Sequence, residues 1–144
     1  MLSSNRKVET ITWFLNWVKE VSPAVQPVVI MTDRDQAQIN TIKNVYSDSQ
    51  ILLCLWHVLC TFRSHFVTKQ FQALWAKIKY WVKTEDTEEF DRIWAEIKSD
   101  PTVPQSFIDY LDSEWMNKDI MWSLSKRTER SLLEEGNTNM LIEA

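Results

Sequence analysis

The chain has 144 residues, 44% of them hydrophobic and 25% charged, so it is long enough for one domain with a hydrophobic core and too apolar for a disordered tail. Its formal net charge of −4 does not favour a nucleic-acid-binding protein, because lysine and arginine make the contacts with phosphate. The longest apolar run without charge, residues 51–62, is far shorter than the roughly 20 residues that cross a bilayer, which excludes a membrane span.

The N-terminal segment is predicted to be an amphipathic helix. No apolar stretch follows the basic residues Arg6 and Lys7, so we expect no signal peptide and an intracellular protein. Apolar residues then recur at spacings of three and four, which predicts one apolar stripe along a helix: Val8, Ile11, Phe14, Leu15, Val18 and Val21. Pro23 ends this pattern.

The next segment is predicted to be a strand, a helix and a second strand. The apolar run Val28–Met31 follows Pro27 without alternation, as expected for a strand that is covered on both faces. Helical spacing begins near Asp35, and an aspartate at this point can cap the first amides of a helix. A second apolar run, Ile51–Trp56, has the length of a strand. Two strands joined by one helix form a parallel crossover unit.

Helical spacing continues from about His57 to the C-terminus. The apolar residues of two successive segments follow it: Phe66, Leu74, Ile78 and Trp81, then Phe90, Ile93, Trp94 and Ile97. Pro101 and Pro104 precede a third predicted helix at residues 105–115, and a last helix is predicted to begin near Asn139. We therefore expect an α/β protein that is mostly helical, with a small sheet followed by a long helical block.

Charge is strongly segregated along the helical part. Residues 61–83 contain no acid and five basic residues: Arg63, Lys69, Lys77, Lys79 and Lys83. Residues 84–119 contain eleven acids and three bases, a balance of −8. The basic residues are either the solvated face of a helix or a surface that contacts DNA, and the charge pattern alone does not decide between these explanations.

Two aspartates, Asp33 and Asp35, directly follow the first predicted strand. Ligands of open parallel sheets bind outside the C-terminal ends of the strands, and a carboxylate at this position suits a hard cation such as Mg²⁺. The alternative is that both aspartates only cap the following helix, which is a common position for aspartate.

A second group of polar side chains is formed by Cys54 and His57, with Cys60 and His65 further along the chain. Cysteine and histidine can bind zinc, but this spacing departs from the paired ligands of structural zinc sites, so we do not expect a structural zinc. The preferred explanation is a buried His57 that is hydrogen-bonded at the strand end, with Cys54 acting as a small apolar side chain. The two cysteines form no disulfide framework, which fits a reducing compartment.

The candidate motifs occur in a specific order along the chain. A strand ending in Thr32-Asp33 precedes a helix and a strand that carries Cys54-Leu55-Trp56-His57; a helical stretch and Asn137-Thr138-Asn139 then precede Glu143. A glutamate in the first turn of a helix also stabilises the helix dipole, so Glu143 alone is a weak signal. The ordered set, which spans nearly the whole chain, resembles the transposase domain of Mutator-like elements (MULE).

The resemblance implies a ribonuclease-H-like fold with a helical insertion, and an enzyme that cuts and joins DNA through an Asp-Asp-Glu triad holding Mg²⁺ or Mn²⁺. It places the second aspartate of the triad at Asp33, with Asp35 as the less suited choice, and the glutamate at Glu143. Cys54 and His57 match the family's Cys-x-x-His motif, which supports the site. The implied partner is the DNA of transposon ends, with a homo-oligomer, no small-molecule substrate and a nuclear location.

The resemblance also divides the chain and exposes a gap in the triad. Residues 1–57 would be part of the ribonuclease-H-like core, 58–135 the helical insertion and 136–144 the start of the glutamate-bearing helix. The family's first aspartate lies on an earlier strand, whereas the acids before Asp33 are Glu9 and Glu20, both in the predicted helix.

We therefore expect a truncated ribonuclease-H-like fold that ends one residue after Glu143 and does not cleave DNA alone. A strand pair without neighbours would expose a hydrophobic edge and be marginally stable. The alternative function is a domesticated or decayed transposase copy that acts as a DNA-binding or protein-interaction module.

Overall fold

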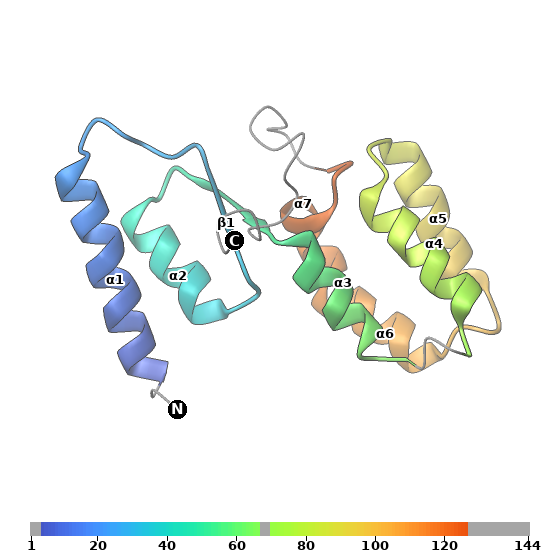
Figure 1. Cartoon of the computed structure of the whole chain (residues 1–144). Coiled ribbons are helices and arrows are strands. Elements are labelled where there is room, and N and C mark those ends of the chain that lie inside the picture. Colours follow the sequence, from blue (N-terminus) through green and yellow to red (C-terminus); the bar gives the residue numbers. More distant parts are fainter. Residues whose placement is uncertain (1–3, 67–69, 127–144) are drawn as a thin grey trace. The chain divides into compact units, whose positions relative to one another are not determined.

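The computed structural model of the chain describes residues 4–66 and 70–126. These residues form two compact units, with the boundary between Leu53 and Cys54 (Figure 1). The first unit contains four elements: α1 (Ser4–Val21), β1 (Val29–Thr32), α2 (Gln36–Val45) and β2 (Gln50–Leu53). In its described part the second unit is helical: α3 (Leu55–Arg63), α4 (Gln72–Lys83), α5 (Thr87–Ser99), α6 (Gln105–Glu114), the 3-10 helix η1 (Met116–Lys118) and α7 (Asp119–Trp122).

The sheet of the first unit has two parallel strands. Val29 of β1 lies opposite Gln50 of β2, and Thr32 lies opposite Leu53. α2 connects the two strands, so the predicted parallel strand-helix-strand unit and the mostly helical α/β class are confirmed. Both strands form where apolar residues follow one another, and the core of this unit lies on α2 and β2: Ile39, Ile42, Val45, Tyr46, Ile51, Leu52 and Leu53.

α1 is the predicted N-terminal helix, and it packs against α2. The Lys19 ammonium donates a hydrogen bond of 2.9 Å to the carbonyl oxygen of Val45, and it lies 5.6 Å from the centre of the Tyr46 ring. The side of α1 that carries these contacts is half-buried and includes Val8, Ile11, Leu15 and Val18. The helix ends at Val21, two residues before Pro23, as predicted.

The opposite side of α1 is apolar and exposed. Phe14 and Val21 are 50% and 61% exposed, so these two residues of the predicted apolar stripe are not buried. Trp13 and Trp17 lie on the same exposed side, with 66% and 48% of their surface accessible. The apolar arc of α1 is wider than a single neighbouring helix can cover, because α2 contacts only one side of it.

Indole rings fill the core of the second unit. The Trp81 ring stacks on Trp94 at a centroid distance of 5.2 Å and meets Trp122 edge-on, also at 5.2 Å. Trp81 Nε1 donates to the carbonyl of Phe90 and Trp122 Nε1 to that of Trp115, both at 3.1 Å. A buried indole needs a partner for its N–H, and local carbonyls provide it for these two rings.

The second strand is shorter than predicted. β2 ends at Leu53 and α3 begins at Leu55, so the apolar run that was expected to be one strand is divided between two elements. Leu55, Val58 and Phe62 are buried on one side of α3. A short apolar run fits a buried strand and a buried helix side equally well, and here its last two residues begin the helix.

The remaining described helices lie where the sequence predicts them, except in the segment between α3 and α4. α6 occupies residues 105–114, close to the predicted 105–115, whereas the helix predicted near Asn139 lies outside the described residues. Phe66 was predicted to share a helix with Leu74 but lies between α3 and α4. Its ring contacts Phe107 of α6 at 5.1 Å, and His65 stacks on Tyr110 of α6 at 3.7 Å, so tertiary packing holds this segment outside a helix.

Candidate functional site

The candidate site begins at the C-terminal end of β1. Thr32 is the last residue of the strand, and Asp33-Arg34-Asp35 links it to α2. Because the strand holds the backbone at this point, a side chain that directly follows it has a fixed origin and reaches the edge of the sheet.

Asp35 is the N-cap residue of α2. Its Oδ1 accepts hydrogen bonds from the backbone N–H of Ala37 at 2.9 Å and of Gln38 at 3.2 Å. These bonds satisfy two of the amides that a helix start leaves without a partner, which is the predicted capping role. The carboxylate of Asp35 therefore already has a structural task.

Asp33 is half-buried and lies two residues before this cap. The neighbouring Thr32 is 3% exposed, and its Oγ1 has no hydrogen-bond partner among the described residues. A buried hydroxyl without a partner is uncommon, and in a protein it often lies near a bound water, ion or ligand. The oxygen chemistry at this strand end fits a hard divalent cation such as Mg²⁺.

Cys54 and His57 lie at the start of the second unit, on either side of the α3 N-terminus. Cys54 is the N-cap residue of α3, is completely buried and makes no side-chain cap bond. His57 is half-buried and its ring meets that of Trp56 edge-on at 4.8 Å. The prediction that this motif lies on a strand is wrong, because α3 begins at Leu55 and carries the histidine in its first turn. Cys60 is exposed further along the same helix.

The structure does not bring together a complete triad. Glu143 lies outside the described residues, as does Lys69. Within residues 4–66 and 70–126, no three side chains of His, Cys, Asp or Glu are grouped closely enough to hold a metal ion. Asp33 is therefore the single carboxylate of the expected triad whose position is described.

Three of the five basic residues are exposed cations. Arg63 ends α3, and Lys79 and Lys83 lie on the exposed side of α4, where Lys79 is 5.9 Å from the centre of the Trp75 ring. Lys77 is different, because it is half-buried and pairs with Glu96 of α5 at 3.3 Å. Of the four basic residues of this stretch that the structure describes, Arg63, Lys79 and Lys83 are thus exposed and form no ion pair with another described residue.

Two acids of α5, Glu89 and Glu96, have a partner on the helix itself. Arg92 donates to both oxygens of Glu89, at 2.6 and 2.8 Å, and also bonds to Glu96. The hydrogen bond from Arg92 lowers the pKa of Glu89 and raises the pKa of Arg92 itself. This surface network neutralises part of the negative charge that follows the basic stretch.

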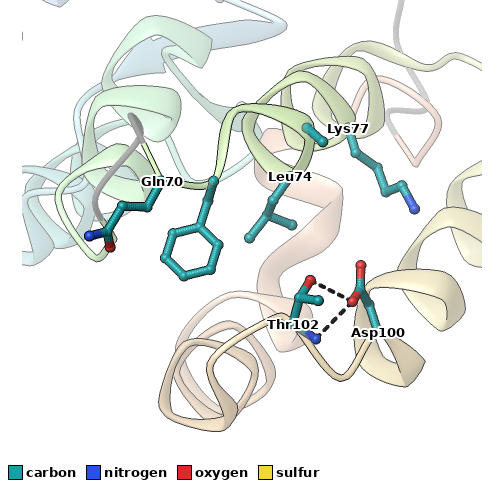
Figure 2. Close-up of a pocket in the computed structure, with 7 residues that line it drawn as sticks. Gln70, Leu74, Lys77, Asp100 and Thr102 are labelled. Carbon is teal, nitrogen blue, oxygen red and sulfur yellow. Dashed lines mark hydrogen bonds between the residues drawn. The ribbon is translucent and has the colours of Figure 1, made fainter.

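A cavity of about 300 Å³ lies in the second unit beside the N-terminal half of α4 (Figure 2). It is lined by Gln70, Phe71, Ala73, Leu74, Lys77, Asp100 and Thr102. The Asp100 carboxylate accepts hydrogen bonds from the Thr102 hydroxyl at 2.6 Å and from its backbone N–H at 2.9 Å, as Figure 2 shows. The bond from the Thr102 side chain, then that from its backbone, lowers the pKa of Asp100. This cavity could not be predicted from the sequence, because its lining comes from residues about 30 positions apart.

The comparison with protein families finds a match over the first part of the chain. The family model of the MULE transposase domain matches residues 1–61. These residues are therefore similar to the MULE transposase domain. The MULE match covers α1, both strands, α2 and most of α3, and it includes Asp33, Cys54 and His57. The resemblance is thus confirmed over this range; searches of the curated proteins and of the solved structures found no match. None of the described helices is both long and apolar enough to cross a membrane.

Proposed function

We propose that the chain is a partial catalytic domain of a DNA transposase with a ribonuclease-H-like fold, in which Asp33 and Glu143 are ligands of catalytic Mg²⁺ or Mn²⁺. The observation that carries the proposal is the division of roles at the end of β1. Asp35 caps α2 through two backbone N–H groups, whereas Asp33 directly follows the strand beside a buried hydroxyl without a partner. Asp33 is therefore the better candidate for a metal ligand.

When bound, divalent cations would activate a water or a 3′-hydroxyl and stabilise the leaving oxygen in an attack on phosphorus. The residues of this chain would contribute position and charge. β1 fixes the backbone position from which the Asp33 side chain extends. The cap made by Asp35 fixes the start of α2, which follows in the chain. In this proposal Cys54 and His57 are the supporting Cys-x-x-His motif of the family, at the start of α3, and the helices that follow belong to the insertion at residues 58–135.

The residues before Asp33 offer no candidate for the first aspartate of the triad. The acids that precede Asp33 are Glu9 and Glu20, and both are exposed on α1. A carboxylate on that helix cannot take the place of one at a strand end, since the two-metal mechanism needs ligands that converge on the same ions. The proposed role on chromosomal DNA implies a nuclear location.

The proposal is tested by Mn²⁺ binding to the purified chain, followed by electron paramagnetic resonance. Asp33→Ala should weaken binding at least about tenfold, since one carboxylate ligand is lost. Asp35→Ala is the matched control, because it removes a carboxylate two residues away. We expect it to keep Mn²⁺ affinity and to lower the free energy of unfolding by about 1 kcal/mol through loss of the cap. Equal Mn²⁺ affinities of Asp33→Ala and the unmodified chain would overturn the proposal.

A second candidate function is a DNA-binding module without catalysis. It is favoured by the exposed cations Arg63, Lys79 and Lys83, two of which lie on a helix that contains no acid. Binding through these cations should weaken with salt, with a slope of about −0.9 per neutralised phosphate in a log-log plot. The Lys79→Ala and Lys83→Ala exchanges should each reduce that slope by roughly one, whereas Lys77→Ala should not because Lys77 pairs with Glu96. A salt-independent affinity would leave a protein-interaction module as the remaining alternative.

A further inference from the structure

The cavity beside α4 has two walls that differ in polarity (Figure 2). One wall comes from α4 and its N-cap residue, and it presents the Phe71 ring and the Leu74 side chain. The other wall comes from the turn after α5, and it presents the Asp100 carboxylate and Thr102. Every lining residue belongs to the described part of the second unit, so the cavity forms without any contribution from the first unit.

The Asp100 carboxylate uses one of its two oxygens within the turn. Its Oδ1 accepts both hydrogen bonds from Thr102, whereas no described residue donates a hydrogen bond to Oδ2. In Figure 2 this second oxygen points toward the side of the cavity that α4 forms. The bonds from Thr102 lower the pKa of Asp100, so the carboxylate is ionised at neutral pH. The cavity therefore contains a negative charge and an acceptor that a ligand can use.

The Lys77 ammonium also lines the cavity, but its charge is already balanced. Lys77 pairs with Glu96 of α5 at 3.3 Å, and no ion pair joins it to Asp100. Arg92 and Glu89 complete this network, whose two positive and two negative charges sum to zero. The unbalanced charge at the cavity is that of Asp100, which favours a cation over an anion as the ligand.

We propose that the cavity binds an organic cation that consists of an ammonium group on a hydrocarbon body. The ammonium donates to Asp100 Oδ2, and the hydrocarbon body lies on Phe71 and Leu74. A hydrogen bond to an ionised carboxylate is stronger than one between neutral groups, and an aromatic ring attracts a cation near its face. The volume of about 300 Å³ is at the lower end for ligand pockets, which fits a small amine or one lysine side chain. The proposal does not depend on the function proposed for Asp33.

The experiment is a titration of the full, isotope-labelled chain with n-butylammonium, followed by nuclear magnetic resonance of the backbone amides. The amide signals of Leu74, Asp100 and Thr102 should shift and saturate at millimolar ligand. The controls are n-butanol and butyrate, which have a hydrocarbon chain without the positive charge. Both should bind at least about tenfold more weakly, because a hydrogen bond between charged groups is lost.

Asp100→Asn should weaken the affinity for n-butylammonium at least about fivefold, because the new amide oxygen still accepts from Thr102 but carries no charge. Asp112→Asn is the matched control, since it removes a carboxylate from an exposed position of α6 outside the cavity lining. It changes the net charge of the chain equally and should keep the affinity. Circular dichroism of both variants checks that the chain remains folded.

A blocked alanine-lysine-alanine peptide distinguishes the two sources of the cation. Shifts of the same amides by the peptide would assign the cavity to a lysine side chain of a partner polypeptide, and shifts by n-butylammonium alone would assign it to a free amine. No saturable shift at the cavity with either probe, equal affinities for n-butylammonium and n-butanol, or an unchanged affinity in Asp100→Asn would each overturn the proposal.

Discussion

The two units differ in how far their large apolar side chains are buried. The second unit buries four of its tryptophans, of which Trp81, Trp115 and Trp122 are at most 1% exposed. The first unit leaves Trp13 and Trp17 about half exposed or more, and it contributes six of the nine large hydrophobic residues that are exposed in the described part of the chain.

The difference teaches where each unit obtains its stability. In the second unit, indole rings pack on one another and donate their N–H groups to local carbonyls, so its core is complete within its own residues. In the first unit, two short strands and α2 form a small core, and the side of α1 that carries Trp13 and Trp17 is exposed. Exposed apolar patches of this kind commonly mark surfaces that contact another polypeptide.

The largest expected effect on stability tests this comparison with one buried and one exposed tryptophan. Trp81→Ala should lower the free energy of unfolding by about 3–5 kcal/mol, because it removes a buried ring from the centre of the aromatic core. Trp17→Ala, the matched exchange on α1, should change it by no more than about 0.5 kcal/mol in the monomer. Urea denaturation measures both, and similar losses for the two variants would show that the units do not differ in this way.

A smaller effect on the free energy of unfolding is expected when two buried threonines of the first unit are replaced. Thr41 Oγ1 donates to the Ala37 carbonyl at 2.8 Å, whereas Thr32 Oγ1 has no partner among the described residues. Thr41→Val should therefore cost about 1 kcal/mol more in unfolding free energy than Thr32→Val, which removes an unsatisfied hydroxyl and should be neutral or stabilising. Thermal denaturation of the metal-free chain measures the difference; a larger loss for Thr32→Val would mean that its hydroxyl is satisfied.

The smallest effect concerns the cavity of the second unit. The hydrogen bonds from Thr102 hold the pKa of Asp100 below its ordinary value, so the ionised form is favoured by folding. This contribution is present above the pKa of the unfolded chain, about 3.9, and is lost as the pH falls through the lower pKa of the folded state. The difference in melting temperature between the chain and its Asp100→Asn variant should thus shrink below about pH 4. A difference that stays constant with pH would contradict this cause.

Much of the first unit could be predicted from the sequence because its signals are local. Pro23 and Pro27 delimit the connection between α1 and β1, and the aspartate before α2 marks its cap. The division of Ile51–Trp56 between β2 and α3 was not predictable, because a short apolar run fits both structures. The exposed side of α1 was missed for a different reason, since periodicity identifies apolar positions but not the number of neighbours that cover them.

The candidate site was predictable only in part. The position of Asp33 at a strand end follows from the local sequence pattern. The capping role of Asp35 could be distinguished from the role of Asp33 only through the two hydrogen bonds that Asp35 accepts in the structure. Whether Asp33 and Glu143 converge depends on the path of the 109 intervening residues, which no local signal determines, and their convergence stays a prediction.

The most direct test of that prediction is backbone cleavage by hydroxyl radicals generated at Fe²⁺ bound in place of Mg²⁺, with the fragments identified by mass spectrometry. Radicals formed at a bound metal cut the chain close to its ligands. We expect one set of cuts beside Asp33 and another beside Glu143, with both sets lost in Asp33→Ala and kept in Asp35→Ala. Cuts near Asp33 without any near Glu143, or cuts that persist in Asp33→Ala, would contradict a shared metal site.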